Sequence, residues 1–372
     1  MKVSICIPHY RQEEYLTRAV LSALEQVSPE DQVEVVVSDN ASGRAANSVL
    51  DQLETLGPQV KVLRNNYNIG MVANFNRAVQ SSAGEVICVL SADDELLPGA
   101  VRAACDEFRS DPELVMVYGY TEVHEDGSPP YTWPRYTGPR HRFDPPAFAF
   151  HNLENPDTPL VSAFFRQSAF DAVGGFKGEA GSVPDWLLWT ELGLVGPVLR
   201  IDRCLGLYRV HGANETVSAR KSFSWILSHY MAESYGRSLV SSALENSGTA
   251  STPASGISPA HPVRGNSAFQ THMTHARRSS LSTALNSLRK GQKGLGRRQL
   301  LLTYSLWPSF RAFAELMGVT ALSFLPRSVI DRTYWWLKSR DARERTSHAQ
   351  PEVIARGARG RVLHTGIKGE SK

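Results

Sequence analysis

The stretch Gly84 to Pro98, GEVICVLSADDELLP, decides the fold class that we predict for this chain. It begins with a short, continuous apolar run from Val86 to Leu90, which is typical of a strand covered on both faces of a sheet. A polar turn, Ser91 to Asp94, follows the run, and Pro98 stands where a helix would begin. The stretch therefore predicts a buried central strand that carries two aspartates at its carboxyl end. In open α/β sheets, ligands bind at that edge.

Asp93 and Asp94 fit two interpretations when they are considered alone. Aspartate is preferred at helix starts, so one carboxylate could cap the following helix while the other is solvated. Alternatively, the pair could hold a hard divalent cation. Mg²⁺ and Mn²⁺ take oxygen ligands and are commonly held by one or two carboxylates, with substrate phosphates completing the shell.

Strands and helices alternate in the sequence before this stretch. Val3 to Ile7, Val33 to Val37 and Val60 to Leu63 are predicted strands, and an amphipathic helical pattern follows each of them. This alternation predicts an α/β fold with a doubly wound, mostly parallel sheet flanked by helices. We expect Pro8 to end the first strand. The turn from Pro8 to Gln12 has no glycine, which argues against a G-x-G-x-x-G site for NAD or FAD.

The composition is that of a globular protein. The chain has 372 residues, of which 42% are hydrophobic, and its net charge of +3 is too small to indicate nucleic acid as a partner. Its cysteines have no C-x-x-C spacing, so we expect reduced thiols and a cytoplasmic protein. Met1 and Lys2 lead directly into a strand, and no apolar run of about 18 residues occurs, so we expect neither a signal peptide nor a membrane-spanning helix.

Four motifs in order along the chain resemble family 2 glycosyltransferases of the GT-A fold. These motifs are IPHY from Ile7, VVVSDNAS from Val35, NNYNIGMVANFNRA from Asn65 and LSADDELLP from Leu90. The resemblance implies a GT-A fold, and the composition of the last third predicts a C-terminal helical, partly disordered extension added to it. The carboxyl ends of three predicted strands, at Pro8 to Tyr10, Asp39 and Asp93 to Asp94, are expected to converge on one crevice.

The resemblance implies a site for the nucleotide of a sugar donor. Its predicted nucleotide-binding residues are Pro8, His9, Tyr10, Asp39, Asn74, Arg77, Ser91 and Ala92. Two of these residues keep a simpler alternative. Asp39 could form an Asx turn after the second strand, and Arg77 could be a solvated surface arginine.

The resemblance also implies a metal site for Mn²⁺ or Mg²⁺. Asp93 matches the second acid of the family's D-x-D signature and would hold the ion against the donor diphosphate, with Asp94 beside it. Ser91 replaces the first acid and brings no charge, so we expect weaker metal binding than is usual in the family. The segment LYRVH, which ends at His211, resembles Y-R-x-H. His211 would then ligate the metal and Arg209 would meet the diphosphate, although a lone histidine is more often structural.

Asp185 is the predicted catalytic base. The segments SAFFRQSAFDAVGGF, from Ser162, and VPDWLLW, from Val183, resemble the family's G-G-F-D-E and E-D-W segments. An acceptor hydroxyl must lose its proton as it attacks the anomeric carbon, which requires a carboxylate nearby. The alternative is that Asp185 is only a helix N-cap. Between these motifs, residues 128–159 are rich in proline and aromatic residues, and predict an irregular loop that forms either an acceptor wall or a self-packed loop.

The predicted domain organisation has one catalytic domain and a different last third. Residues 1–220 would form the catalytic domain, with a nucleotide-sugar half, 1–118, and an acceptor half, 119–220. We expect a helix at 221–245, a linker at 246–280, a basic and apolar helical region at 281–340 and a disordered tail at 341–372. The region 281–340 fits either a peripheral contact with the cytoplasmic membrane or a helical hairpin packed on the catalytic domain.

The expected function is a metal-assisted, inverting transfer of a sugar from a nucleotide-diphosphate donor, with UDP as the default. The acceptor would be a hydroxyl of a glycan or of a lipid-linked saccharide, as in polysaccharide assembly for the cell envelope, at the inner face of the plasma membrane. Two alternatives remain. One is a non-catalytic nucleotide-sugar binding protein of the same fold, and the other is a nucleotidyltransferase, which would need a glycine-rich phosphate loop after the first strand.

Overall fold

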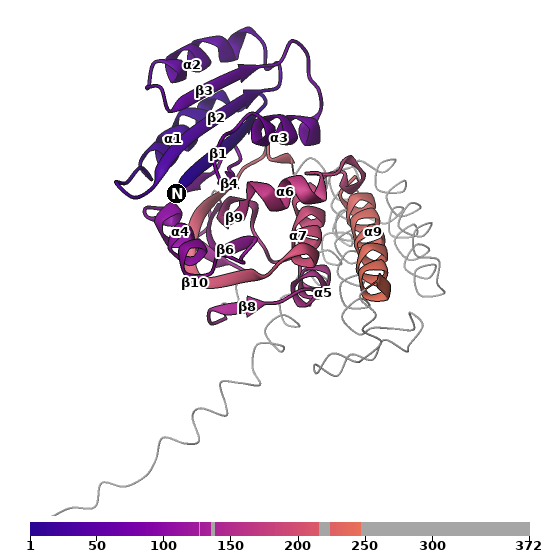
Figure 1. The fold of residues 1–372 in the computed structure, drawn as a ribbon. Coiled ribbons are helices and arrows are strands. Elements are labelled where there is room, and N and C mark those ends of the chain that lie inside the picture. The colour runs from indigo at the N-terminus through magenta and orange to yellow at the C-terminus, as the bar shows by residue number, and fades with distance from the viewer. Residues whose placement is uncertain (126, 135–137, 216–223, 247–372) are drawn as a thin grey trace, which may run out of the picture. The chain divides into compact units, whose positions relative to one another are not determined.

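The computed structural model describes residues 1–125, 127–134, 138–215 and 224–246 (Figure 1). The chain divides into two units, 1–272 and 273–372, and every described residue belongs to the first. The predicted segments 281–340 and 341–372, and the linker 246–280 beyond its first residue, lie outside the described residues. No helix within the described ranges combines the length and the apolar character that crossing a membrane requires.

The described residues form one mixed sheet with helices on both of its faces (Figure 1). In chain order the elements are β1 (Lys2–His9), α1 (Glu13–Leu24), β2 (Gln32–Asp39), α2 (Arg44–Glu54), β3 (Val60–Arg64), α3 (Met71–Gln80), β4 (Val86–Val89), β5 (Glu95–Leu96), α4 (Ala100–Ser110), β6 (Met116–Glu125), β7 (Tyr131–Trp133), β8 (His141–Phe143), α5 (Ala147–Glu154), the 3₁₀ turn η1 (Leu160–Ser162), β9 (Ala163–Arg166), α6 (Gln167–Val173), the 3₁₀ turn η2 (Gly178–Ala180), α7 (Pro184–Val195), β10 (Val198–Val210) and α9 (Ser224–Asn246).

The sheet has the order β3-β2-β1-β4-β9-β6-β10-β5, with β7 beside β6 and β8 beside β10. Its longest ladders are parallel and join β3 to β2, β2 to β1, β1 to β4 and β6 to β10. The antiparallel strand β9 lies between β4 and β6. This arrangement confirms the predicted α/β fold of the GT-A type.

Strand β4 lies between β1 and β9, as its continuous apolar sequence predicts. Each of its residues, Val86 to Val89, is fully buried. The helix predicted after Pro98 is α4, and Val101, Ala104, Cys105 and Phe108 on its inner face are buried. The carboxyl end of a fully covered strand is thus held firmly at the edge of the sheet.

Alternate residues of the strands contribute to two separate cores, one on each face of the sheet. On β1, Ile5 and Ile7 pack with helices α1, α2 and α4, whereas Cys6 packs on the opposite face with α3, α6 and α7. This separation follows from the two-residue period of a strand, which sends neighbouring side chains to opposite faces. Both cores end near the carboxyl ends of β1 and β4, where polar residues follow.

The prediction that Pro8 ends the first strand is wrong. Strand β1 continues to His9, and Pro8 lies in register with Ser38 of β2. Proline is tolerated here because its nitrogen faces the β4 side, where the pairing of β1 has already stopped at Cys6 and Val89. The extra residues carry His9 directly beside Asp39.

The prediction of an irregular loop at 128–159 is also wrong. The segment contains β7, β8 and helix α5. Strand β6 gives β7 a partner, so that Trp133 pairs with Thr121. Strands of three residues are too short to show a period in the sequence.

Helix α9 covers helices α5 and α7 and forms a third apolar cluster with them. Ala232 and Val240 of α9 are buried in it against Trp186 and Leu187 of α7. The hydroxyl of Ser228 accepts a hydrogen bond from the backbone N–H of Ser182 at 2.9 Å. Helix α9 therefore braces the turn that precedes α7.

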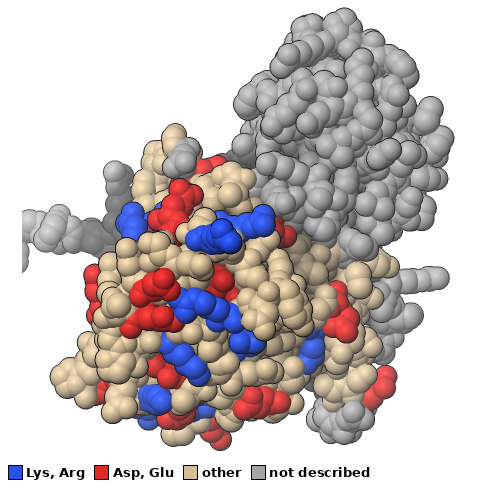
Figure 2. All heavy atoms as spheres, turned by 90° about the horizontal axis from the view of Figure 1, so that it is seen from above, with Lys and Arg blue, Asp and Glu red and all other residues tan. Residues whose placement is uncertain are grey.

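The surface of the described residues carries both signs of charge. On the face drawn in Figure 2, Lys and Arg side chains lie among Asp and Glu side chains. Surface ion pairs such as Arg64 with Asp51, at 2.7 Å, and Arg102 with Glu30, at 2.8 Å, show the same mixing.

Candidate active site

Three strand ends meet at one edge of the sheet, as the sequence predicts. His9 ends β1, Asp39 ends β2, and Asp93 follows β4 in a turn closed by a hydrogen bond from the Asp94 N–H to the Ser91 carbonyl at 3.0 Å. Gln12 lies between them and contacts both His9 and Asp93. Side chains that are far apart in the sequence thus form one polar layer.

Asp39 is held by a compact group of hydrogen bonds. His9 Nδ1 donates to Asp39 Oδ1 at 2.9 Å, and the Ser42 hydroxyl donates to the same oxygen at 2.6 Å. Burial would raise the pKa of Asp39, but the hydrogen bonds from His9 and Ser42 outweigh it and hold this pKa below its usual value. The carboxylate is therefore ionised and fixed in orientation.

His9 orients Asp39 and the turn that follows β1. Its side chain is fully buried, and its Nε2 accepts the backbone N–H of Gln12 at 3.2 Å. Because Nε2 is an acceptor, the ring proton is on Nδ1, which donates the hydrogen bond to Asp39. Both ring nitrogens are thus engaged within the protein, whereas Tyr10, beside it, is 38% exposed. Pro8 is buried beneath this turn.

Asn74 and Arg77 of α3 are placed differently from each other. Asn74 is buried, and its amide donates to the Ser38 carbonyl at 2.8 Å while its oxygen accepts from Ser38 and Asn65. These contacts fix α3 against β2, so Asn74 supports the site from within. Arg77 is exposed, outside the residues that line the cavity described below, and makes no ion pair with another described residue.

Asp93 accepts three hydrogen bonds on one oxygen. Its Oδ2 receives Gln12 Nε2 at 2.7 Å, Asn214 Nδ2 at 2.9 Å and His211 Nε2 at 3.0 Å. His211 Nδ1 accepts the N–H of Ala213 at 3.2 Å, which leaves the proton on Nε2. The ring of His211 also stacks on Tyr15, with centroids 4.7 Å apart. The carboxylate of Asp93 is therefore fixed by its neighbours on one side.

Asp94 is buried beside Asp93 and lines the cavity. The backbone N–H of Arg209 donates to Asp94 Oδ1 at 3.0 Å. Burial and the negative charge of Asp93 raise the pKa of Asp94 well above its usual range. The guanidinium of Arg209 donates to the Asp93 carbonyl at 2.7 Å and pairs with Glu95, so it holds the turn that carries both acids.

The residues at this turn fit a hard divalent cation that is completed by substrate phosphates. Asp93 Oδ1 receives no hydrogen bond from the described residues, because its three donors all reach Oδ2. A carboxylate oxygen is a suitable ligand for Mg²⁺ or Mn²⁺. No group of three or more His, Cys, Asp and Glu side chains that could hold a metal ion occurs among the described residues. His211 bonds to Asp93 through Nε2 and Ser91 lines the cavity, whereas Ala92 is buried under the turn.

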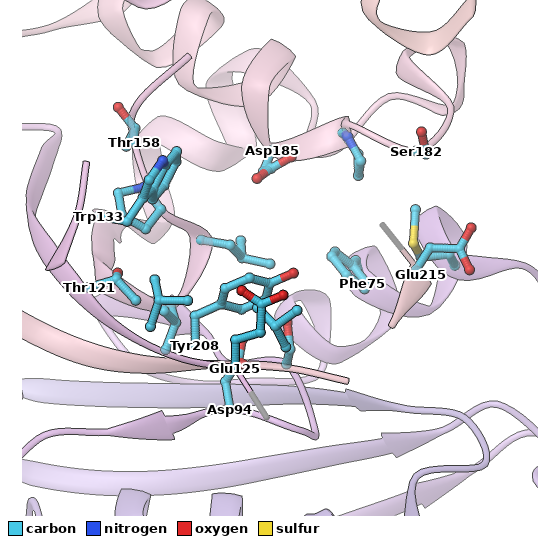
Figure 3. Close-up of a pocket in the computed structure, with 18 of the residues that line it drawn as sticks. Phe75, Asp94, Thr121, Glu125, Trp133, Thr158, Ser182, Asp185, Tyr208 and Glu215 are labelled. Carbon is cyan, nitrogen blue, oxygen red and sulfur yellow. The ribbon is translucent and has the colours of Figure 1, made fainter. Parts of the chain in front are cut away.

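A cavity of about 450 Å³ lies next to this turn and reaches helix α7. Figure 3 shows Asp185 across the cavity from Asp94, with Trp133 to one side and Phe75 to the other. Tyr208 of β10 lies between them. The cavity therefore joins the end of β4 to the residue predicted as catalytic base.

Asp185 lies in the first turn of α7 and is not its N-cap, because Val183 occupies that position and Pro184 begins the helix. Burial raises the pKa of Asp185 to about 6, although backbone N–H groups of Trp186 and Asp185 itself oppose this rise. A carboxylate with that pKa is ionised at neutral pH and is a stronger base than an exposed aspartate. The geometry places such a base on the wall of the cavity.

A family model described as Glycosyl transferase family 2 matches residues 4–174, which include β1 to β4, the turn with Asp93 and Asp94, and strand β9. The match places residues 4–174 in glycosyl transferase family 2. The match confirms the resemblance carried by the four motifs. Asp185, Arg209 and His211 lie beyond the matched segment.

Two relatives and one solved structure are similar to this family 2 chain. It is 29% identical to chondroitin synthase of Escherichia coli over 219 residues, which cover 58% of this chain and 30% of the synthase. It is 27% identical over 128 residues to a GalNAc(5)-diNAcBac-PP-undecaprenol beta-1,3-glucosyltransferase of Campylobacter jejuni, covering 34% of this chain and 40% of that protein. The chain thus spans less than half the length of either relative. S. aureus TarS 1–349 in complex with UDP-GlcNAc has a TM-score of 0.48 and 15% identity, covering 90% of this chain and 92% of that chain.

Several residues that shape this family 2 site were not predicted from the sequence. Gln12, Ser42 and Asn214 contact the predicted acids, and Tyr208 and Glu125 line the cavity. Ser42 and Asn214 each stand three residues after a predicted site residue, a spacing that could have indicated them. Of the aromatic residues expected at an acceptor wall, Trp133 lines the cavity, whereas Phe148 is fully buried in a core.

Proposed function

We propose that this chain is a metal-assisted, inverting glycosyltransferase that moves a sugar from a nucleotide-diphosphate donor to a hydroxyl of a glycan or lipid-linked acceptor. The observation that carries the proposal is the cavity that has Asp185 on one wall and Ser91 and Asp94 on the other. One molecule in this cavity could contact both the turn after β4 and a carboxylate suited to accept a proton. UDP is the first donor nucleotide to test.

In the proposed reaction, the described residues bind the donor and remove a proton from the acceptor. Asp39 and Tyr10 would hold the nucleoside, and Asp93 and Asp94 would supply ligands at the diphosphate. When bound, Mn²⁺ or Mg²⁺ offsets negative charge on the diphosphate. Asp185 would accept the proton of the acceptor hydroxyl as the oxygen bonds to the anomeric carbon and the nucleoside diphosphate leaves.

The acceptor is proposed to be a saccharide, either free or attached to a lipid carrier. Trp133, Tyr131 and Tyr208 line the cavity and offer aromatic faces on which a sugar ring can pack. The two relatives are a chondroitin synthase and a GalNAc(5)-diNAcBac-PP-undecaprenol beta-1,3-glucosyltransferase, which supports both acceptor types. A lipid-linked acceptor would be met at the cytoplasmic face of a membrane.

The test is transfer from radiolabelled UDP-sugars to a panel of oligosaccharides and undecaprenol-linked saccharides, with Mn²⁺ or Mg²⁺. Wild-type protein should form product, and Asp185→Asn should reduce kcat by at least about a hundredfold while binding UDP with unchanged affinity. Glu14→Gln, an exposed change on α1, is the matched control and should leave kcat unchanged.

A second candidate, a non-catalytic nucleotide-sugar binding protein, is favoured by one observation. Ser91 stands where the family's first acid would bring a second charge, so the donor diphosphate would be held less firmly for transfer. Binding of UDP-sugars without transfer to any acceptor would support this candidate and contradict the enzyme. Loss of both UDP binding and sugar transfer in Asp185→Asn would show that Asp185 is needed for the folded structure and not specifically for proton transfer.

The proposed membrane contact is tested with the full chain and anionic lipid vesicles. The variant changes a basic cluster to glutamate, at Arg289, Lys290, Lys293, Arg297 and Arg298. If the cluster binds the inner membrane face, wild-type protein should sediment with the vesicles and the variant should not. Equal sedimentation would contradict the contact.

A further inference from the structure

Gln12 is the residue that joins the two ends of the candidate donor site. Its backbone N–H donates to His9 Nε2 at 3.2 Å, and its side-chain amide donates to Asp93 Oδ2 at 2.7 Å. His9 in turn donates to Asp39 at 2.9 Å. One continuous set of hydrogen bonds therefore runs from Asp39, at the predicted nucleoside end, to Asp93, at the predicted diphosphate end.

Hydrogen bonds fix the backbone both before and after Gln12 in the sequence. Arg11, just before it, has a φ of 57°, in the left-handed region that residues other than glycine rarely adopt. The N–H of Arg11 donates to the Ser42 hydroxyl at 2.9 Å, so this strained turn is tied to the Asp39 group. After it, the Gln12 carbonyl accepts the N–H groups of Tyr15 and Leu16, at 3.1 and 3.2 Å, and so begins α1. The side chain of Gln12 is thus aimed at Asp93 by a rigid backbone.

The amide of Gln12 acts on one oxygen of Asp93 only. With His211 and Asn214 it fills the space around Oδ2, and these three donors together prevent the carboxylate from rotating. Oδ1 receives no hydrogen bond from the described residues, so none of these three donors competes with a cation for that oxygen. A neutral amide adds no charge, so it directs the carboxylate without competing for a cation.

We propose that Gln12 is a positioning residue that presents Asp93 Oδ1 to a divalent cation bound with the donor diphosphate. This inference rests on the proposed function, because it requires that a nucleoside diphosphate and a cation bind together at Asp93. Neighbours of this kind set the orientation of metal-binding carboxylates, and their loss typically weakens metal binding by about 10- to 100-fold. Gln12 does not touch the substrate in this role.

The experiment measures UDP affinity by calorimetry, with and without Mn²⁺, in full-length wild type, Gln12→Met and Gln12→Ala. Methionine keeps the length and the helix preference of glutamine but has no donor. In wild type, Mn²⁺ should raise UDP affinity. In both variants, the factor by which Mn²⁺ raises UDP affinity should be about tenfold smaller than in wild type. Their UDP affinity without Mn²⁺ should change less than about twofold, and Glu14→Gln should match wild type.

A double variant shows whether Gln12 acts through Asp93. Asp93→Ala should abolish the gain from Mn²⁺, and adding Gln12→Met to it should cause no further change. A full Mn²⁺ gain in both Gln12 variants would overturn the inference, as would a wild type that binds UDP equally with and without Mn²⁺. A wild type that binds no UDP under either condition would instead contradict the proposed function itself.

Discussion

At the scale of single residues, Asp185 combines two properties that a catalytic base needs. It lies on the cavity wall, and burial raises its pKa to about 6. Because the base must be deprotonated, kcat/KM should be level above pH 6 and should fall about tenfold for each pH unit below it. A pH profile from 4.5 to 8 with saturating Mn²⁺ measures this. A profile that stays level down to pH 5 would contradict Asp185 as the base.

The same residue should lower the stability of the folded protein near neutral pH. An unfolded aspartate has a pKa of about 3.9, whereas burial holds folded Asp185 at about 6. The folded state therefore binds the proton more tightly, and the free energy of unfolding falls as pH rises between these values. We expect Asp185→Asn to be more stable than wild type at pH 7, by about 1–3 kcal/mol.

Urea unfolding at pH 7 and at pH 4 measures this difference. The gain in Asp185→Asn should be largest at pH 7 and should be mostly lost at pH 4, where the folded wild-type carboxyl is protonated and the unfolded one is about half protonated. A variant that is less stable than wild type at both pH values would mean that the Asp185 carboxylate stabilises the fold, and that its removal cannot report on catalysis alone.

Residues with charge at motif positions were predictable, whereas their supporting partners were not. Asp93 and Asp185 were predicted because the segments around them resemble motifs of family 2 glycosyltransferases. Gln12 was not, because nothing in a single glutamine shows that a left-handed residue before it will aim the amide at Asp93, 81 positions later. Such partners depend on backbone geometry, which residue spacing does not specify.

At the scale of elements, helix α9 is predicted to stabilise the turn before α7. Val240 is 3% exposed in the cluster that α9 forms with α5 and α7, whereas Tyr235 on the same helix is 43% exposed. Val240→Asp buries an unpaired charge and should lower the free energy of unfolding by about 3 kcal/mol. Tyr235→Asp is the matched control and should change it by less than about 1 kcal/mol. Equal effects in urea unfolding would show that α9 is not packed there.

Elements with a long apolar pattern were predicted well, and short edge elements were not. Strand β4 was recognised from its continuous apolar run, and helix α4 from the helical spacing of its buried residues. Strands β7 and β8 have three residues each, and they form because the longer strands β6 and β10 provide partners. Pairing with a distant strand therefore decided these elements, and a local pattern could not show it.

At the scale of the whole described molecule, the cavity is a composite of distant segments. Phe75 comes from α3, Asp94 from the turn after β4, Trp133 from β7 and Asp185 from α7. The sheet order brings these segments together because β9 inserts between β4 and β6. The motifs alone predicted the polar layer of His9, Asp39 and Asp93, since these residues lie at the ends of neighbouring strands. The part of the cavity formed by Trp133 and Asp185 depends on how the two halves of the sheet are joined, which the motifs do not specify.

The charge of this cavity predicts which sugars it accepts. Among the described lining residues, the acids are Asp94, Glu125, Asp185 and Glu215, and none is lysine, arginine or histidine. A uronic acid would place its carboxylate near Glu125, Asp185 and Glu215, and like charges a few ångströms apart repel by about 1 kcal/mol or more. UDP-GlcNAc should therefore bind at least about fivefold more tightly than UDP-glucuronic acid in calorimetry. Glu125→Gln should lower the ratio of the UDP-GlcNAc affinity to the UDP-glucuronic acid affinity. Glu14→Gln, which is exposed and outside the cavity, should leave this ratio unchanged. Equal affinity of wild type for both donors would mean that the donor sugar does not reach this part of the cavity.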